Sequence, residues 1–167
     1  GTGTSLSLGA LGAAIGGSAT GAGTGTLNGG SAAVTIAGNF TVPVYTASSG
    51  TTSIAGTTVT FGTLTHSNGT VVMNGTGTPV ALSTGNQSFY NLSITTGGGP
   101  ETVNVAGTIT VANDLVVVAG HTLACGNNAV TVTGTTTNAG TISLGTAVAT
   151  FTGLVTNTGG TLTGGSG

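Results

Sequence analysis

The chain has 167 residues, of which 37% are apolar, so it is long and apolar enough to fold as one domain with a core. It contains no lysine or arginine, and Glu101 and Asp114 are its only acidic residues. Because nucleic-acid binding needs cationic side chains and acid–base catalysis generally needs several titratable groups close together, this composition argues against both and favours a structural role.

Residues 1–30 form a segment rich in glycine and alanine, with an apolar stretch at 5–16. This stretch is too short and too rich in glycine for a membrane-spanning helix, which needs about 20 apolar residues. We expect instead that the segment caps the domain or lends a strand to a neighbouring copy of the chain, as in donor-strand fibres. No membrane span is therefore predicted.

The remaining chain is divided by glycine and asparagine into short pieces in which apolar and small polar residues alternate. This period is that of short β-strands separated by corners. The pieces are irregular over residues 31–99 and regular over 100–167. Residues 34–41 (VTIAGNFT) nevertheless align with 130–137 (VTVTGTTT), matching Val34 to Val130. We therefore expect one architecture and a single β domain over residues 1–167.

The C-terminal half matches itself without gaps at one constant shift, which aligns Thr122 with Thr141 and Gly126 with Gly145 and places Cys125 above Leu144. A fixed period of about 20 residues is typical of solenoids. Three short strands per rung then give the rungs 102–120, 121–140 and 141–159. The fold prediction is an all-β parallel β-helix with about 19–20 residues per rung and about eight rungs. The alternative is an antiparallel β-sandwich or jelly roll, which has no reason to repeat at this period.

The same pattern predicts which side chains face the core. The inward residues of the three regular rungs are expected to be Val103, Val105, Ile109, Val111, Leu115, Val117, Leu123, Val130, Val132, Ile142, Leu144, Val148 and Phe151. The sequence GGGP at 97–100 is expected to form a bulged corner or a junction between the two halves.

Residues 69–99 combine an NGTGT stretch with a strand in which an aromatic residue precedes NLSI. Together with the repeats that follow, they resemble the β-helical repeats of large bacterial surface and secreted proteins, such as filamentous-haemagglutinin-type adhesins and surface-layer-like proteins. The likeness covers about residues 30–165. It implies a right-handed parallel β-helix displayed outside the cell as a stalk, fibre or coat. This chain departs from such repeats in lacking lysine and arginine altogether.

Few residues suggest a chemical site. Glu101 and Asp114 fall on different segments of one predicted rung without a cationic partner, so no catalytic residue, metal site or cofactor is predicted. His66 and His121 are expected at corners or on the surface, and Cys125 is expected to be buried and free. Five Asn-x-Ser/Thr triplets provide candidate N-glycosylation acceptors at Asn39, Asn68, Asn74, Asn86 and Asn91.

The sequence thus predicts a non-enzymatic, extracellular structural protein, the subunit of a self-assembling and protease-resistant filament or surface layer. Neither end carries a charged cap, and a net charge of −2 gives little repulsion, so the expected partner is another copy in end-to-end contact. The alternative is an adhesin stalk that binds glycans or other cell-surface components. Such a module would favour an exposed aromatic patch, for which Phe89 and Tyr90, with Tyr45 as an outlier, are the candidates.

Overall fold

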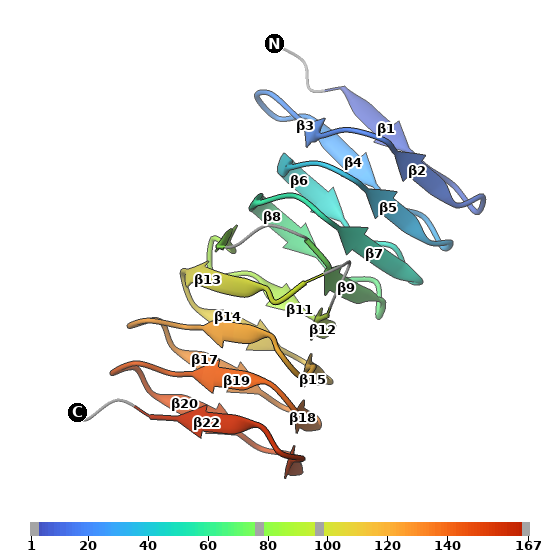
Figure 1. Ribbon diagram of the computed structural model, residues 1–167. Helices are drawn as coiled ribbons and strands as arrows, with labels where there is room; N and C mark the ends of the chain where they lie inside the picture. The colour runs from blue at the N-terminus through green and yellow to red at the C-terminus, as the bar shows by residue number, and fades with distance from the viewer. Residues whose placement is uncertain (1–3, 76–78, 96–98, 165–167) are drawn as a thin grey trace.

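The computed structural model describes residues 4–75, 79–95 and 99–164. This part of the chain forms an all-β rod with its two ends at opposite poles (Figure 1). The pairings between its strands are parallel, so the fold is a β-solenoid and not a sandwich. Its strands are β1 (Ser5–Ser7), β2 (Ala13–Ile15), β3 (Ala19–Thr20), β4 (Thr26–Asn28), β5 (Val34–Ile36), β6 (Phe40–Thr46), β7 (Thr51–Ile54), β8 (Thr58–Thr65), β9 (Thr70–Met73), β10 (Val80–Ser83), β11 (Ser88–Phe89), β12 (Asn91–Ile94), β13 (Thr102–Ala106), β14 (Ile109–Val111), β15 (Leu115–Val117), β16 (Thr122–Ala124), β17 (Val130–Val132), β18 (Thr136–Asn138), β19 (Thr141–Ser143), β20 (Ala149–Phe151), β21 (Val155–Asn157) and β22 (Thr161–Thr163).

Each turn of the solenoid passes through three strand positions, which stack along the rod as three columns. Over the described residues the chain completes about eight turns, always in the order first, second, third column. The first column contains β1, β4, the second halves of β6 and β8, β11, β14, β17 and β20. The second contains β2, β5, β7, β9, β12, β15, β18 and β21. The third contains β3, the first halves of β6 and β8, β10, β13, β16, β19 and β22.

The long strands β6 and β8 join two columns without an intervening turn. The first half of β6 pairs with β3, where Phe40 lies beside Ala19, and the second half pairs with β4, where Val44 lies beside Thr26. β8 pairs along both halves of β6. The chain therefore passes from the third column of one turn to the first column of the next within a single strand.

The core is built from the alternation within each strand, because one face of each strand points into the rod. Residues of similar kind stack in successive turns: Leu27 lies beside Tyr45, and Tyr45 beside Leu64. Aromatic rings fill the N-terminal half, where the Phe61 ring lies 5.1 Å from that of Phe40 and 5.7 Å from that of Phe89. Aliphatic side chains dominate the core of the C-terminal half.

The predicted register is confirmed in the regular rungs. Thr122 pairs with Thr141, and Cys125 lies above Leu144. Gly126 and Gly145 both adopt a φ of 60° at the same corner, and a Cβ on Gly145 would overlap the carbonyl oxygen of Gly126. Only glycine fits this close, left-handed corner.

Turn length varies more than the sequence pattern predicts. The turn that pairs Thr26 with Val44 is shorter than the predicted rungs, whereas the turn that pairs Val80 with Val103 is longer. In the regular half, Thr102 pairs with Thr122, so that turn slightly exceeds the predicted rung 102–120. The differences in length fall in the corners, where the backbone does not have to keep the strand pairing.

One predicted core residue is wrong. Val148 is 76% exposed, because Ala149 and Phe151 pair with the inward residues of β17 and Val148 has the opposite parity. The alignment of Val34 with Val130 reflects a shared strand pattern and not a shared place, since β5 belongs to the second column and β17 to the first. The predicted corner at 97–100 lies partly outside the described residues.

Residues 4–28 of the N-terminal segment form the first turn and the start of the second. β1 pairs with β4, β2 with β5 and β3 with β6, all within the same chain. Each of these first-turn strands is paired along one edge only, so the edge facing away from the rod remains open among the described residues. β20, β21 and β22 present the equivalent open edges at the other pole.

Candidate functional site

Glu101 and His121 are stacked at one corner of the rod, immediately before the third-column strands β13 and β16. The pairing of Thr102 with Thr122 places the two residues one above the other in successive turns. Both side chains are buried, and the backbone N–H of Glu101 donates to Nδ1 of His121 over 3.2 Å. Nδ1 is therefore the unprotonated nitrogen, and the neutral ring carries its proton on Nε2. The sequence analysis expected His121 at a corner or on the surface. The residue does lie at a corner, but its side chain is buried inside the rod.

Burial controls the protonation of this pair. It raises the pKa of the Glu101 carboxyl from 4.5 to about 7, because the charged form loses its hydration, while the nearby backbone N–H of Gly75 acts in the opposite direction. Burial lowers the pKa of His121 for the same reason. Both groups favour their neutral forms, so this corner is a dry polar contact and not an ion pair.

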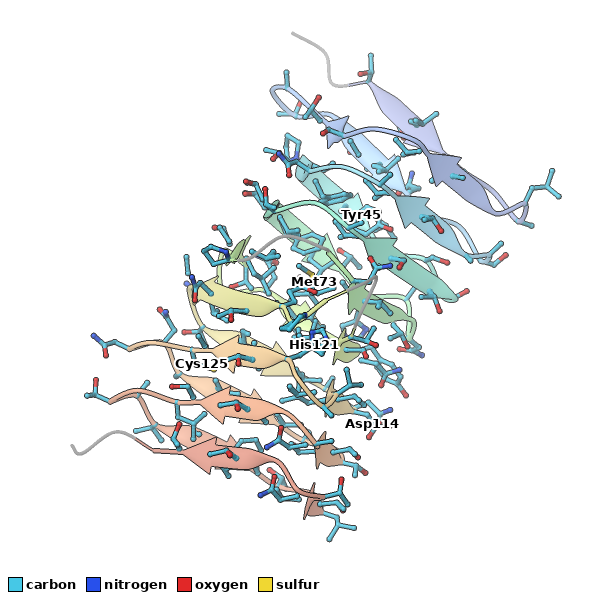
Figure 2. The ribbon with its side chains drawn as sticks, viewed as in Figure 1. Tyr45, Met73, Asp114, His121 and Cys125 are labelled. Atoms are coloured by element: carbon cyan, nitrogen blue, oxygen red, sulfur yellow. The ribbon has the colours of Figure 1, made fainter. Side chains whose placement is uncertain are left out.

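Asp114 lies at a different corner, immediately before the second-column strand β15 (Figure 2). Glu101 instead precedes the third-column strand β13, so the two carboxyl groups belong to different corners. Its Oδ1 accepts from the backbone N–H of Thr135 at 3.0 Å, and its Oδ2 accepts from Asn113 at 3.2 Å. Asn113 also donates to Asn91 Oδ1 at 2.8 Å. Asp114 thus belongs to a ladder of polar side chains that satisfies backbone groups at this corner.

The exposed aromatic patch that a glycan-binding module would favour does not form from Phe89, Tyr90 and Tyr45. Phe89 and Tyr45 are fully buried, and the Tyr45 hydroxyl and Thr52 Oγ1 are hydrogen-bonded at 2.7 Å inside the rod. Tyr90 alone of the three is partly exposed, with its ring 5.6 Å from that of His66. Tyr45 and Phe89 occupy positions of their strands that alternate toward the core. Correct placement of the corners would have allowed the sequence pattern to predict this.

Cys125 is buried and free, at the corner that follows β16 (Figure 2). Burial raises the pKa of its thiol to about 11. Because the thiolate is the nucleophilic form, Cys125 is unreactive near neutral pH.

The candidate glycosylation residues occupy different environments. Asn68 and Asn86 are exposed and adopt positive φ values of 61° and 63°. Asn39 Oδ1 accepts from the backbone N–H groups of Thr57 and Thr58. The remaining two candidate glycosylation residues, Asn74 and Asn91, are half-buried. The side-chain amide of Asn91 donates a hydrogen bond to Thr70 Oγ1 at 3.2 Å.

The two poles of the rod are its most distinctive surfaces. The exposed large apolar side chains of the described residues all lie in the first or the last turn: Leu6, Leu11, Val148, Leu154, Val155 and Leu162. At the N-terminal pole a cavity of about 430 Å³ opens between the columns, with Leu6, Ile15, Ala19 and Leu27 among its lining residues. No titratable side chain lines this cavity among the described residues.

Metal ligands do not gather in the part of the chain that the structure describes, where no group of three His, Cys, Asp or Glu residues could hold an ion. Across the same residues there is no helix long and apolar enough to cross a bilayer. No protein family matches this chain, and no curated protein or solved structure is significantly similar to it. The parallel β-solenoid is therefore established by its own strand pairings, and a function has to be argued from its own residues.

Proposed function

We propose that this chain is a non-enzymatic structural protein, the subunit of an extracellular filament or surface layer that assembles from its own copies. The observation that carries this proposal is the confinement of exposed large apolar side chains to the two end turns of the rod. Apolar surface gathered in this way, next to unpaired strand edges, is typical of an interaction surface.

The sides of the rod support the same proposal. Their outward residues are mainly threonine, serine and asparagine, and some of them are hydrogen-bonded between successive turns, as Thr146 Oγ1 is to Asn127 Oδ1 at 2.6 Å. Such sides are hydrated but uncharged. Association is therefore favoured at the ends over the sides, and the expected product is a fibre one rod wide or a sheet of such fibres.

The composition suits a persistent material. The chain offers trypsin no cleavage site, because it contains neither lysine nor arginine. A continuous parallel sheet also pairs its backbone groups along the whole assembly and leaves few exposed edges for proteases or other strands. We place the protein with the β-helical repeat regions of bacterial surface and secreted proteins on the strength of its repeats, as a fibre component and not as a glycan-binding stalk.

The test is assembly of the purified chain, followed by pelleting and electron microscopy over rising protein concentration. We expect filaments with a spacing of about 4.8 Å along the axis. Assembly should respond little to salt, because the end turns contain no charged side chain among the described residues. Rods that remain one subunit long at every concentration would contradict the proposal.

Matched charge variants separate the ends from the sides. The double variant Leu154→Asp and Leu162→Asp places two charges in the last turn and should abolish filaments. The control, Asn104→Asp and Ala106→Asp, adds the same two charges on exposed residues of β13 in the middle of the rod and should assemble normally. Equal loss of assembly in both variants would show that net charge, and not the end surface, controls association.

A further inference from the structure

We propose that copies stack head to tail in one register, with β20, β21 and β22 of one copy pairing with β1, β2 and β3 of the next. This inference rests on the proposed function and adds the arrangement of the subunits. It follows from the phase of the solenoid, from the shapes of the two poles and from the place of the exposed side chains.

The two poles match in the columns at which the described chain begins and ends. The described chain enters the rod in the first column, with β1, and its last strand, β22, lies in the third column. Each pole therefore presents one strand edge from each column at the same level. A second copy placed on the C-terminal pole can extend all three columns at once, with no missing or duplicated strand.

The side chains at the C-terminal pole include one inward residue from each column. Phe151, Val155 and Leu162 pair in register with the buried residues of the preceding turn, which shows that they face the core. Val155 and Leu162 are nevertheless 39% and 41% exposed, because the described chain provides no further turn to cover them. We call these three residues the C-terminal face.

The N-terminal pole presents the complementary surface. Its inward residues are Leu6, Ile15 and Ala19, again one from each column, and we call them the N-terminal face. The cavity of about 430 Å³ lies at this face. In the proposed register Leu162 lies over Ala19 of the next copy, so a large side chain meets the smallest residue of the N-terminal face.

The exposed corner residues agree with the same register. Leu11 is 85% exposed in the corner between β1 and β2, and Leu154 is 69% exposed in the corner between β20 and β21. Both corners join the first column to the second. Head-to-tail stacking therefore brings the two leucines to the same edge of the rod, where they shield each other from water.

A contact between two different faces is heterologous, so it does not close on itself and produces an open filament with a direction. Eight turns at a spacing of about 4.8 Å give a repeat of about 38 Å per subunit. Head-to-head and tail-to-tail contacts are disfavoured because they would oppose the direction of the strands, and they would join two identical faces instead of a cavity and its complement.

Disulfide formation between introduced cysteines tests the register. Ala14 and Thr156 are the outward residues at the centres of β2 and β21, and the proposed pairing places them in neighbouring turns. Adjacent parallel strands lie about 4.8 Å apart, within the range of Cα separations that a disulfide bridges. All variants carry Cys125→Ala, so that the native thiol does not contribute.

The double variant Ala14→Cys and Thr156→Cys should give a ladder of covalent oligomers on non-reducing gels after mild oxidation. Each single variant should remain monomeric when oxidised alone, and an equal mixture of the two should give dimers only. Covalent dimers from a single variant would overturn head-to-tail stacking. Filaments in the microscope without crosslinks from the double variant would overturn the register, while leaving the proposed function intact. Absence of filaments and crosslinks together would overturn both.

A second pair guards against local disruption of the second column. Thr20→Cys with Thr163→Cys links outward residues of the third column, in the step that pairs Leu162 with Ala19. A circular dichroism spectrum of each variant reports whether the rod has folded. If the variants of both pairs fold and assemble but do not crosslink, the proposed register is excluded. The second and third columns would each provide independent evidence against it.

Discussion

The middle and the ends of this rod are built from the same kind of strand, yet they differ in what covers the inward side chains. In β14 the inward residues Ile109 and Val111 are fully buried between two neighbouring turns. In β22 the inward residue Leu162 stacks on one turn only and is 41% exposed. Burial in a solenoid is therefore a property of neighbouring turns, and a turn without a neighbour is an incomplete part of the core.

The largest expected difference between the two regions concerns core substitutions. Phe61→Ala removes a buried ring that contacts Phe40, Tyr45 and Phe89, and should lower the free energy of unfolding by about 3–5 kcal/mol. Leu162→Ala in the last turn should cost less than about 1 kcal/mol in the unassembled protein, because much of that side chain is already in water. Denaturant unfolding below the assembly concentration measures both. Similar losses would show that the last turn is covered in the single copy.

The second difference concerns pH, because the stacked pair of buried titratable groups lies in the middle of the rod. Below pH 4.5 Glu101 is protonated in both the folded and the unfolded chain. Between pH 4.5 and 7 it ionises first in the unfolded chain, so the folded state loses up to about 3 kcal/mol relative to the unfolded state. His121 acts in the opposite direction, because its lowered pKa costs stability as the pH falls below 6.5.

Glu101→Gln isolates the carboxyl contribution. The variant and the unmodified protein should have similar stability at pH 4, and the variant should become more stable relative to it as the pH rises to 8. Chemical unfolding at several pH values gives this difference directly. Two parallel stability curves would show that the Glu101 carboxyl is hydrated in the folded protein.

The third difference concerns glycines that adopt a positive φ at corners of the rod, and whether a neighbouring turn leaves room for a side chain there. Gly145→Ala should destabilise the rod by about 2 kcal/mol or more, because the new Cβ meets the backbone of Gly126 as well as an unfavourable φ of 60°. Gly159→Ala is the matched control in the last turn, where φ is 76° and nothing lies within 4 Å of the new atom. Its cost should be only the conformational part, about 1 kcal/mol. Thermal unfolding of the two variants compares them, and equal shifts would exclude the steric part.

The sequence predicted the fold where turn length is regular. From Thr122 onward the spacing between turns is nearly constant, so like residues recur at a fixed interval and Thr122 could be paired with Thr141. Farther toward the N-terminus the spacing is uneven, because some turns are shorter and others longer than those of the regular half. An alignment such as Val34 with Val130 then detects a strand but not its column.

The side on which a residue lies was harder to predict, because it depends on where a corner interrupts the alternation. Val148 was assigned to the core although the alternation restarts at Ala149. Phe89 was a candidate for an exposed aromatic patch only under the alternative of a binding module, and it pairs with the buried Val111. Glu101 and His121 are separated by one turn of the solenoid, so their spacing in the sequence was enough to predict that they stack. Their spacing did not predict that both side chains point inward, because the conformation of the corner sets that direction.

The smallest expected effect on folding falls on the two corner leucines. Leu11→Ser and Leu154→Ser should each change the free energy of unfolding by less than about 0.5 kcal/mol, because both side chains are exposed in the single copy. Each should raise the concentration required for assembly by about tenfold, through the loss of apolar burial between copies. Because the two leucines meet at one contact, the double variant should raise that concentration by less than the product of the single effects. Pelleting assays measure the three values. Effects that multiply in full would mean that Leu11 and Leu154 act at separate contacts, and the ends of neighbouring rods would then meet in a different register.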